Sequence, residues 1–309
     1  MADAALDGGW AMPYFQSMIL EMTDEFAIGV VGGSGLYQMD GLEEIEERRI
    51  RTPFGDPSDK VIVGRIDGRR VCFLPRHGVG HRILPHEINH KANIWALRSL
   101  NVRWLVSVTA VGSLREEMAP RDIVVPDQLI DRTGTAGKHT FFGNGIAGHV
   151  GFADPYCPDL RAIVLAAARP LMPRLHEKGT LMTMNGPAFS TRAEAHMHRM
   201  MGADLIGMTN APEARLSREA EISMATLALV TDYDCWKEDE EDVDVATVIG
   251  HMQANSALAK RILRDVIVNI PGDPASRAHK ALDTAIMTPR ELWPEKTIDD
   301  LAPILGRFR

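Results

Sequence analysis

Short apolar runs alternate with segments of helical periodicity along most of this chain, and that alternation constrains its fold more than any other feature. The runs predicted to be buried strands lie at 104–112, 179–184, 204–208 and 224–231. The segments predicted to be helices lie at 87–100, 158–170, 191–201, 211–221 and about 244–269. A helix between two strands implies a parallel crossover connection. The sequence therefore predicts an α/β fold with a mixed, largely parallel central sheet flanked by helices.

The first third of the chain is predicted to be rich in strands. Residues 26–32 form a short apolar run, and the GGSGLY segment at 32–37 supplies the glycines that a tight turn needs. Two more apolar runs, 61–66 and 70–75, flank Asp67 and Gly68. An Asp-Gly pair between two such runs is typical of a type I′ hairpin.

Three segments are expected along the chain. Residues 1–24 match neither a strand nor a helix pattern and are expected to form a disordered tail. Residues 25–270 carry the alternation and are expected to form a single domain. PGDPAS at 271–276 is predicted to be a linker, and residues 277–309 are predicted to hold one or two short helices broken at Pro289 and Pro294. Residues 271–309 would thus form a C-terminal helical extension.

Charge and cysteine usage exclude several kinds of partner. The formal net charge of −8 argues against nucleic acid, whose backbone is bound by clustered Lys and Arg. The three cysteines, Cys72, Cys157 and Cys235, are too few and too dispersed for a disulfide framework, which favours a reducing cytoplasm. The chain has no apolar run of 18 residues, and its start lacks the pattern of a signal peptide. A soluble, cytoplasmic protein without a membrane partner is expected.

Two carboxylates, Asp232 and Asp234, follow directly on the apolar run at 225–230. Their side chains would share a side if the chain stays extended, because strand residues alternate between faces. Ligands of open α/β sheets bind beyond the carboxyl ends of the strands, so the pair is a candidate binding site. Asp also commonly caps turns, and this second interpretation stays open.

Two segments in the first third place anion-binding groups after predicted strands. GGSGLY brings backbone amides together and adds the Ser34 hydroxyl, although it matches neither a dinucleotide fingerprint nor a P-loop. An ordinary turn is the alternative there. Arg76 and His77 follow the run at 70–75, so a guanidinium fork and an imidazole would stand at the sheet edge, suited to a phosphate.

Two later segments add further groups for the same anion. Thr109 and Ala110 lie near the end of a predicted buried strand, where a hydroxyl and an amide are able to hold an oxygen, although Thr is also an ordinary strand residue. Asn210 and Glu213 resemble an N-cap with its capping-box partner. The amides of a helix that starts there would add positive potential close to Thr209.

A metal site is not predicted. The histidines of residues 75–90 are interrupted by Gly78, Gly80 and Pro85, which disfavours the helical spacing that zinc sites use. They are His77, His81, His86 and His90. The acidic run at 238–244 lacks the glycine of a calcium-binding loop and is better explained as a solvated helix start.

A set of motifs in order along the chain resembles one known family. They are GVVGGSGLY, TPFGDPSD, RHG, ANIWAL, TAVGSLREE, IDRT, GPAFSTRAE, MTNAPEA and TDYDCWKE. Together they strongly resemble the S-methyl-5′-thioadenosine phosphorylases of the trimeric purine nucleoside phosphorylase superfamily, from about Ala27 to the C-terminus. The resemblance implies a purine nucleoside phosphorylase-like single domain, with the extension at 271–309 packing near the active site as in microbial members.

The resemblance also implies roles for individual residues. The phosphate would be held by Ser34, Arg76, His77, Thr109, Ala110 and Thr209. Met208 would pack on the ribose, and the purine would be contacted by Phe189, Ser190, Asp232 and Asp234. The pocket for the methylthio group would consist of Val243, Val245 and Val248, with His149 contributed by a neighbouring subunit. Ala188 departs from the family pattern, because many relatives carry Arg there.

The implied reaction is phosphorolysis of S-methyl-5′-thioadenosine to adenine and 5-methylthioribose 1-phosphate, a step of purine and methionine salvage. Asp232 would act as the general acid at N7, and inorganic phosphate would be a co-substrate, with no cofactor and no metal. A homo-oligomer is implied, either a trimer or a dimer of trimers.

Three alternatives to this reaction remain: a phosphorylase of 6-oxopurine nucleosides, a hydrolase that uses water, and a non-catalytic nucleotide-binding module. Two acceptor-capable acids favour a purine with an amino group over a 6-oxo base, which Asn would bind better.

Overall fold

The structure is a computed structural model that describes residues 25–33, 35–36, 38–172, 174–237, 245–272 and 276–308. For residues 136, 245–248 and 252–254 it describes the backbone alone. The predicted disordered tail at 1–24, Ser34, Val243 and the acidic run at 238–244 therefore lie outside the described residues. The side chains of Val245 and Val248 lie outside them as well.

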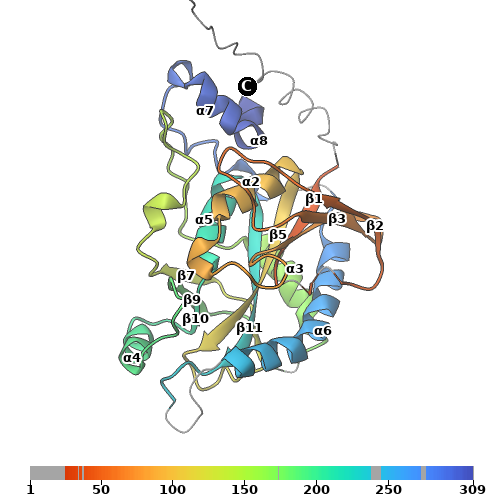
Figure 1. Cartoon of the computed structure of the whole chain (residues 1–309), viewed down its shortest axis with the longest axis vertical. Coiled ribbons are helices and arrows are strands. Elements are labelled where there is room, and N and C mark those ends of the chain that lie inside the picture. The colour runs from red at the N-terminus through yellow and green to blue at the C-terminus, as the bar shows by residue number, and fades with distance from the viewer. Residues whose placement is uncertain are drawn as a thin grey trace, which may run out of the picture.

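An eleven-stranded mixed sheet forms the centre of the fold (Figure 1). Its main path runs β2-β3-β4-β1-β5-β10-β9-β7, and β11 pairs with β5 and leads on to β6 and β8. Six of the pairings between described strands are parallel and four are antiparallel, which confirms the predicted mixed, largely parallel sheet. The strands are β1 (Ala27–Gly32), β2 (Leu42–Arg48), β3 (Val61–Ile66), β4 (Arg69–Pro75), β5 (Val102–Ser113), β6 (Ile123–Val124), β7 (Gln128–Asp131), β8 (Leu175–His176), β9 (Thr180–Thr183), β10 (Leu205–Gly207) and β11 (Ser223–Asp232).

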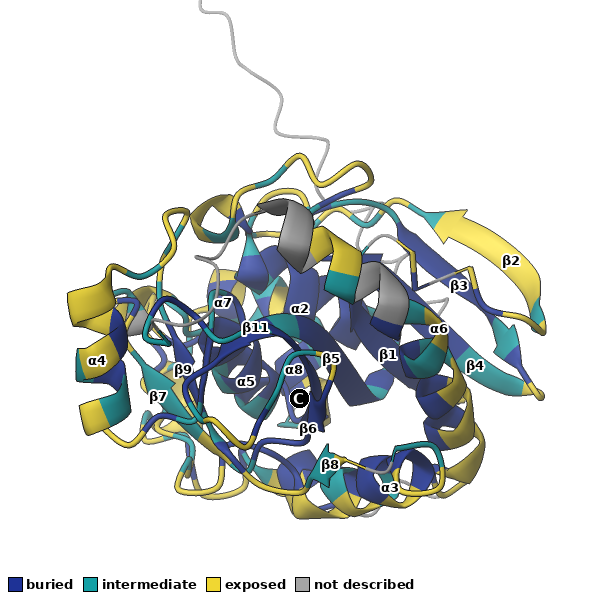
Figure 2. Ribbon diagram, turned by 90° about the horizontal axis from the view of Figure 1, so that it is seen from below, coloured by how far each residue is buried: buried dark blue, intermediate teal, exposed yellow. Residues whose placement is uncertain are grey.

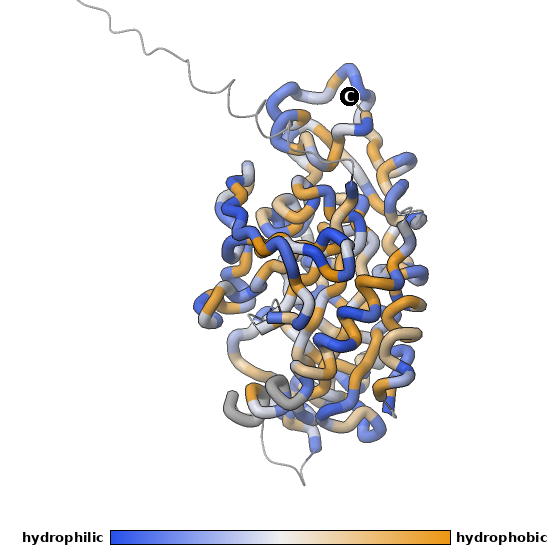
Figure 3. The backbone as a smooth tube through the Cα atoms, turned by 90° about the vertical axis from the view of Figure 1, so that its right-hand side faces the viewer, coloured by the Kyte–Doolittle hydropathy of each residue, from blue (hydrophilic) through white to orange (hydrophobic). Residues whose placement is uncertain are grey.

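Helices cover both faces of the sheet, as predicted. On one face α2 (His90–Ser99) packs against α5 (Asn210–Glu219), and on the other α3 (Pro158–Ala168) packs against α6 (Val245–Asn269). The buried positions of α6 recur at helical spacing: Ala259, Ile262, Leu263, Val266 and Ile267. The same segregation is visible along the other helices, where hydrophobic and hydrophilic residues alternate (Figure 3). Figure 2 shows the strands between the helices as buried, with β2 and α4 (Arg192–Met200) largely exposed.

The predicted hairpin and the first predicted helix are both confirmed. Ile66 pairs with Arg69, and Asp67 and Gly68 both have positive φ, as a type I′ turn requires. The helix predicted at 87–100 spans His90–Ser99, because Asn89 accepts a hydrogen bond from the Ala92 amide and so caps it; a short 3-10 turn, η1 (Pro85–Glu87), precedes it.

The carboxyl ends of four parallel strands meet at one edge of the sheet. β1 is parallel to both β4 and β5, and β5 is parallel to β11. These strands end at Gly32, Pro75, Ser113 and Asp232, and we call this the carboxyl edge.

The C-terminal segment is helical in short pieces, as predicted, and lies at the other end of these strands. It consists of η3 (Arg277–Lys280), η4 (Arg290–Leu292), α7 (Glu295–Asp300), α8 (Ala302–Leu305) and η5 (Gly306–Phe308), with α7 and α8 at the top of Figure 1. His279 Nε2 lies 2.9 Å from the hydroxyl of Ser223, the first residue of β11. The Trp95 indole donates a 2.8 Å hydrogen bond to the Asp300 carbonyl. Within one chain this segment therefore does not reach the carboxyl edge.

No helix in the described part of the chain is both long enough and apolar enough to cross a membrane.

Candidate active site

The groups predicted to bind an anion meet around β5 at the carboxyl edge. Arg76 directly follows β4, and its Nη1 donates a 3.1 Å hydrogen bond to the Val108 carbonyl of β5, next to Thr109. Beyond the end of β1, on the same side of β5, the antiparallel strand β10 brings Gly207 to Ala110, since a Cβ at Gly207 would lie 3.9 Å from the Ala110 carbonyl. Thr209 follows two residues later. The structure thus brings Arg76, Thr109, Ala110 and Thr209 together.

Arg76 is held by a buried acid that the sequence interpretation did not identify as a partner. Its Nε donates to Glu213 Oε1 at 2.5 Å and its Nη2 to Glu213 Oε2 at 3.0 Å, and both side chains are only 2–3% exposed. The Ser107 hydroxyl accepts from Arg76 Nη2 at 2.7 Å and donates to Glu213 Oε2 at 2.7 Å. Four of the five guanidinium N–H groups are engaged, so one on Nη1 is left to reach an anion.

The predicted capping box at Asn210 and Glu213 is wrong. α5 begins at Asn210, which makes Thr209 the N-cap, and no side-chain cap hydrogen bond forms. The Asn210 amide instead donates to Thr226 Oγ1 at 2.9 Å, and the Tyr156 hydroxyl donates to Asn210 Oδ1 at 2.5 Å. Both polar residues were assigned to local capping because their sequence spacing fits it. A buried charge needs a partner, however, and here tertiary contacts supply one for Glu213.

The Thr209 hydroxyl is buried at the start of α5 and has no hydrogen-bond partner among the described residues. A buried hydroxyl without a partner is energetically unfavourable. Its position at the N-terminus of a helix, beside Arg76 and β5, is suited to an oxyanion that would satisfy it.

His77 is a neutral group at this site. Burial, together with the charge of Arg76, lowers its pKa to about 4. Nδ1 lies 2.8 Å from the Ile83 carbonyl, which is able only to accept, so Nδ1 carries the proton and Nε2 is an acceptor. His77 would therefore accept a hydrogen bond from a protonated phosphate oxygen and would not act as a cation. Its ring stacks on His81, with centroids 4.2 Å apart.

The acid pair lies further along β5, against Gly112. Asp232 pairs with Gly112 in the sheet, and a Cβ at Gly112 would lie 2.8 Å from Asp232 Oδ1 and 3.5 Å from Asp234 Cβ. Gly112 lies three positions after Thr109 on β5, about 10 Å along the strand at a rise of ~3.3 Å per residue. The anion-binding groups and the acids thus lie along one strand, at a separation that fits a nucleoside.

Both oxygens of Asp232 accept hydrogen bonds. The Asp234 amide donates to Oδ1 at 2.8 Å, and the Thr231 hydroxyl donates to Oδ2 at 2.7 Å. Burial raises the pKa of Asp232, and these two hydrogen bonds oppose the rise. The Thr231 hydroxyl also lies 3.2 Å from the Val111 carbonyl. When Asp232 is ionised, the Thr231 hydroxyl donates to Oδ2. When Asp232 is protonated, the hydroxyl is able to accept a hydrogen bond from Oδ2 and to donate one to the Val111 carbonyl, so both protonation states are accommodated.

Asp234 has the more strongly perturbed carboxyl. Burial raises its pKa to about 6; the nearby Ser190 hydroxyl lowers it, and the charge of Asp232 raises it again. Its Oδ2 is buried without a hydrogen-bond partner among the described residues. Because the two acids interact directly, their titration belongs to the pair. An incoming donor such as an exocyclic amine would satisfy Asp234 Oδ2.

We predict that Asp234→Asn stabilises the protein at neutral pH. The folded state holds the Asp234 proton up to about pH 6, whereas the unfolded state holds it only up to the ordinary Asp pKa of 3.8, so the free energy of unfolding falls as the pH rises through that window. Asparagine removes this cost, about 3 kcal/mol above pH 6, and tolerates the positive φ of residue 234. Urea unfolding at pH 7.5 should show a higher midpoint for the variant, with the gain vanishing near pH 4.

Asp265→Asn is the matched control for this substitution, because Asp265 is exposed on α6. It should leave the urea midpoint unchanged at both pH values. A midpoint of Asp234→Asn equal to that of the unchanged protein at pH 7.5 would show that the Asp234 carboxyl is not strained by burial.

The segment that carries two predicted base-contacting residues lies beside this pair. The Cys235 thiol donates to the Ser190 carbonyl at 3.1 Å, which ties the Phe189 and Ser190 segment to the acids. Phe189 is 40% exposed, so its ring is accessible to a ligand. Met208 packs on Gly186, where a Cβ would lie 2.5 Å from its sulfur.

The structure places His149, which was predicted to be a site residue, away from the carboxyl edge. Its amide donates to the Ala285 carbonyl at 2.8 Å, and it lines a cavity of about 470 Å³ with Phe142 and Thr288, beside the C-terminal segment. Within one chain His149 therefore lies outside the candidate site. Its predicted role in the site of a neighbouring subunit stays a prediction.

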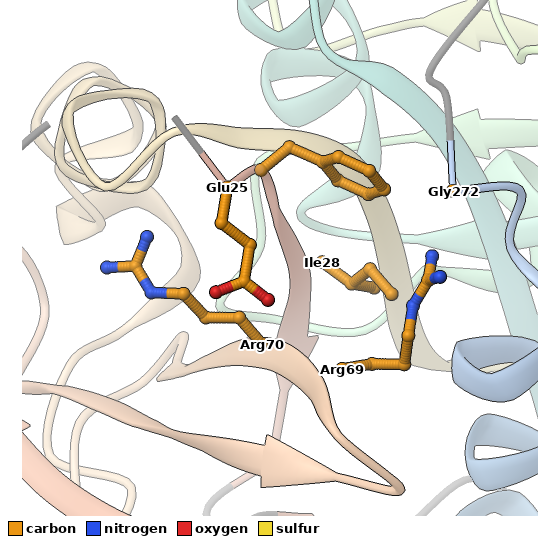
Figure 4. A pocket seen from close by; sticks show the side chains of 6 residues that line it. Glu25, Ile28, Arg69, Arg70 and Gly272 are labelled. Carbon is orange, nitrogen blue, oxygen red and sulfur yellow. The ribbon is translucent and has the colours of Figure 1, made fainter. Parts of the chain in front are cut away.

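A second cavity, of about 230 Å³, lies at the amino ends of β1 and β4 and is distinct from the candidate site (Figure 4). Glu25, Phe26, Ile28, Arg69, Arg70 and Gly272 line it. Arg69 donates to the Ile270 carbonyl at 2.7 Å, so this charge already binds the end of α6. Among the residues that the structure describes, His, Cys, Asp and Glu side chains do not gather in threes as a metal centre requires.

Comparison with known proteins finds one family. The model of the Phosphorylase superfamily matches residues 27–268. S-methyl-5′-thioadenosine phosphorylase of Geobacter sulfurreducens is 49% identical over 284 residues, which cover 92% of this chain and 99% of that protein. The enzyme of the same name from Hyperthermus butylicus is 51% identical over 248 residues, 80% of this chain and 89% of that protein.

Solved structures agree with the sequence relatives. The crystal structure of a methylthioadenosine phosphorylase from an antarctic soil metagenomic library superimposes with a TM-score of 0.86 at 45% identity, covering 92% of this chain and all of that one. A mutant adenosine/methylthioadenosine phosphorylase from Schistosoma mansoni, in complex with methylthioadenosine, has a TM-score of 0.74 at 35% identity, covering 79% of this chain and 91% of that one.

Proposed function

Because this chain belongs to the Phosphorylase superfamily, we propose that it catalyses the phosphorolysis of S-methyl-5′-thioadenosine. Relatives that share about half of its residues over nearly their whole length carry that activity in their names. The observation that carries the proposal is the placement of two unsatisfied buried groups along β5. Neither the Thr209 hydroxyl nor Asp234 Oδ2 has a hydrogen-bond partner among the described residues. The first lies at the start of α5, toward Arg76, and the second belongs to the acid pair against Gly112.

The reaction breaks the C1′–N9 bond of the nucleoside and forms a bond between C1′ and a phosphate oxygen. Adenine leaves with the bonding electrons, so a proton delivered to N7 neutralises the charge that would build up on the base. The products are adenine and 5-methylthioribose 1-phosphate. Inorganic phosphate is a co-substrate, and neither a cofactor nor a metal takes part in the proposed chemistry.

Phosphate would be bound by the groups around the start of α5. The free N–H of Arg76 and the Thr209 hydroxyl donate to it, and neutral His77 accepts from its protonated oxygen. Glu213 keeps the guanidinium fixed while the anion binds, so little rearrangement is needed. Phosphate held next to C1′ gains the advantage of a positioned reactant. Ser34, Thr109 and Ala110 complete the proposed set.

Asp232 is the proposed general acid, with Asp234 as the acceptor for the exocyclic amine. Burial favours the neutral form of Asp232, and the Thr231 hydroxyl accommodates its proton. Phe189 and Ser190 would lie along the purine, and Met208 on the ribose. Val243, Val245, Val248 and a neighbour's His149 form the proposed pocket for the methylthio group. A pocket of this kind discriminates by only about 10–200-fold, so adenosine should be a slower substrate.

A homo-oligomer, either a trimer or a dimer of trimers, is part of the proposal. The support is the position of His149, which lies beside the C-terminal segment and far from the carboxyl edge of its own chain. A cytoplasmic location is likewise proposed, on the basis of three dispersed free cysteines, which fit a reducing compartment.

The test is a panel of four nucleosides assayed with and without phosphate: methylthioadenosine, adenosine, methylthioinosine and inosine. We expect methylthioadenosine to be cleaved fastest, adenosine more slowly, and the two 6-oxopurines least. Release of base should require phosphate and should yield the sugar 1-phosphate. Cleavage that persists after complete removal of phosphate would identify a hydrolase, and tight binding without turnover would identify a binding module.

A further inference from the structure

A β-bulge interrupts the pairing of β11 with β5 just before the acid pair. Val230 pairs with Val111 and Asp232 pairs with Gly112, so Thr231 is an extra residue on β11. A bulge bends its strand and redirects the side chains that follow it. Because Thr231 is only 1% exposed, its backbone carbonyl needs a buried hydrogen-bond donor from outside the ladder.

The donor comes from the helix that covers this end of the sheet. His251, on α6, places Nδ1 2.5 Å from the Thr231 carbonyl. The carbonyl is able only to accept, so Nδ1 carries the hydrogen. The Thr231 hydroxyl in turn donates to Asp232 Oδ2 at 2.7 Å. The bulged residue Thr231 is thus held by His251 through its backbone carbonyl and bound to the proposed acid through its side-chain hydroxyl, which links α6 to the site.

We propose that His251 is a positioning residue for Asp232, which holds the Thr231 bulge so that the Asp232 carboxyl stays against Gly112. The inference rests on the proposed phosphorolysis, in which Asp232 delivers the proton to N7. The Asp232 carboxyl packs closely against the backbone there, because a Cβ at Gly112 would lie only 2.8 Å from Asp232 Oδ1. A rotation of the bulge would remove Asp232 from both of its hydrogen bonds.

The titratable groups that face the acid pair lie on two other elements, α6 and α4. The His251 ring on α6 acts on Asp232, where burial raises the pKa and the imidazole opposes the rise. Glu194 on α4 acts on Asp234, where burial raises the pKa and the Glu194 charge adds to the rise.

Two substitutions at His251 separate the effect of losing the hydrogen-bond donor from the effect of losing the imidazole ring. His251→Ala removes the donor, whereas His251→Asn keeps one, because the Asn amide nitrogen lies as many bonds from Cα as His Nδ1. In a phosphate-dependent assay, His251→Ala should lower kcat/KM for the nucleoside about tenfold, the upper range for the loss of one hydrogen bond. KM for phosphate should not change. His251→Asn should restore kcat/KM to within about threefold of the unchanged enzyme.

Arg261→Ala, an exposed change on the same helix, is the control and should have full activity. Thermal unfolding checks that each variant is folded, and His251→Leu, which also lacks a donor, replaces the alanine variant if that one is not. Full activity of His251→Ala, or equal losses in His251→Ala and His251→Asn, would overturn the inference.

Failure of the proposed function would be seen separately, as an unchanged enzyme that releases no adenine. The crystal structure of His251→Ala decides the inference in that case. We expect the Asp232 carboxyl to have left the Thr231 hydroxyl and the Asp234 amide. An Asp232 carboxyl that keeps both hydrogen bonds would show that His251 does not position it.

Discussion

The Asp232→Asn variant should release adenine from methylthioadenosine roughly 10²–10⁴ times more slowly than the unchanged enzyme, the usual contribution of a general acid. Asparagine keeps the shape of the side chain: its oxygen is able to accept from the Asp234 amide, and its NH2 group is able to donate to the Thr231 hydroxyl, which then donates to the Val111 carbonyl, so the bulge should survive. What it lacks is a proton acidic enough to reach N7. The measurement is kcat at saturating phosphate, and the loss should appear in kcat more than in KM.

Two comparisons make this result specific. Asp265→Asn makes the same change on the exposed side of α6 and should leave kcat unaltered. A nucleoside whose leaving group needs no protonation, such as a nitrophenyl riboside, should lose far less activity in Asp232→Asn. Unchanged cleavage of methylthioadenosine would remove Asp232 from the acid role and leave Asp234, with its unsatisfied Oδ2, as the candidate.

Glu213→Gln should lower the free energy of unfolding by about 3–5 kcal/mol, the cost of breaking a buried ion pair on one side. Both Arg76 and Glu213 are almost inaccessible to water, so the change leaves a buried guanidinium without its counter-charge. Phosphate should also bind more weakly, because glutamine has a single acceptor oxygen and Arg76 therefore loses one of the two contacts that fix its orientation. Urea unfolding measures the first effect, and KM for phosphate measures the second.

The matched control is Glu44→Gln, which breaks an exposed ion pair with Arg65 of 3.1 Å. Surface pairs contribute little, so its urea midpoint should not move. The double variant Arg76→Met/Glu213→Leu should recover much of the stability lost in Glu213→Gln while remaining unable to use phosphate, because a well-packed apolar pair avoids the desolvation cost. Equal midpoints for Glu213→Gln and Glu44→Gln would contradict the role assigned to the buried pair.

Much of the fold was predictable because the buried elements carry strong patterns. β5 and β11 are almost wholly buried and rich in apolar residues, so they were placed within two residues of their ends, and α6 repeats apolar positions at helical spacing. β2 was missed, since its LEEIEER sequence is exposed at the edge of the sheet and has neither a buried face nor strong strand residues. Its position is set by pairing with β3, which no local pattern reveals.

The residues of the candidate site were predictable from the sequence, but the contacts between them were less so. Arg76, Thr209 and the acid pair were identified because each follows a strand or opens a helix at one edge. Glu213 was misassigned, because a Glu in the first turn of a helix usually caps it or faces solvent. A signal was present: Glu213 and Ser217 lie one helical turn apart on the buried face of α5, where a charge requires a tertiary partner.

The roles of Thr231 and His251 depend on a feature that sequence does not show. The bulge exists only in the pairing of β11 with β5, and His251 is one of eleven histidines in the chain, with nothing in the sequence around it in α6 to mark it. A difference of one residue in register would have turned Thr231 toward the ladder and left His251 without its acceptor. Local sequence constrains neither the register nor the helix that packs over it.

The most direct measurement is a crystal structure of the protein with phosphate and a non-hydrolysable methylthioadenosine analogue. We expect phosphate on the Thr209 hydroxyl and Arg76 Nη1, the purine N7 and exocyclic amine on Asp232 and Asp234, and C1′ between them. A phosphate bound away from Thr209, or a purine that leaves Asp234 Oδ2 without a partner, would contradict the proposed site.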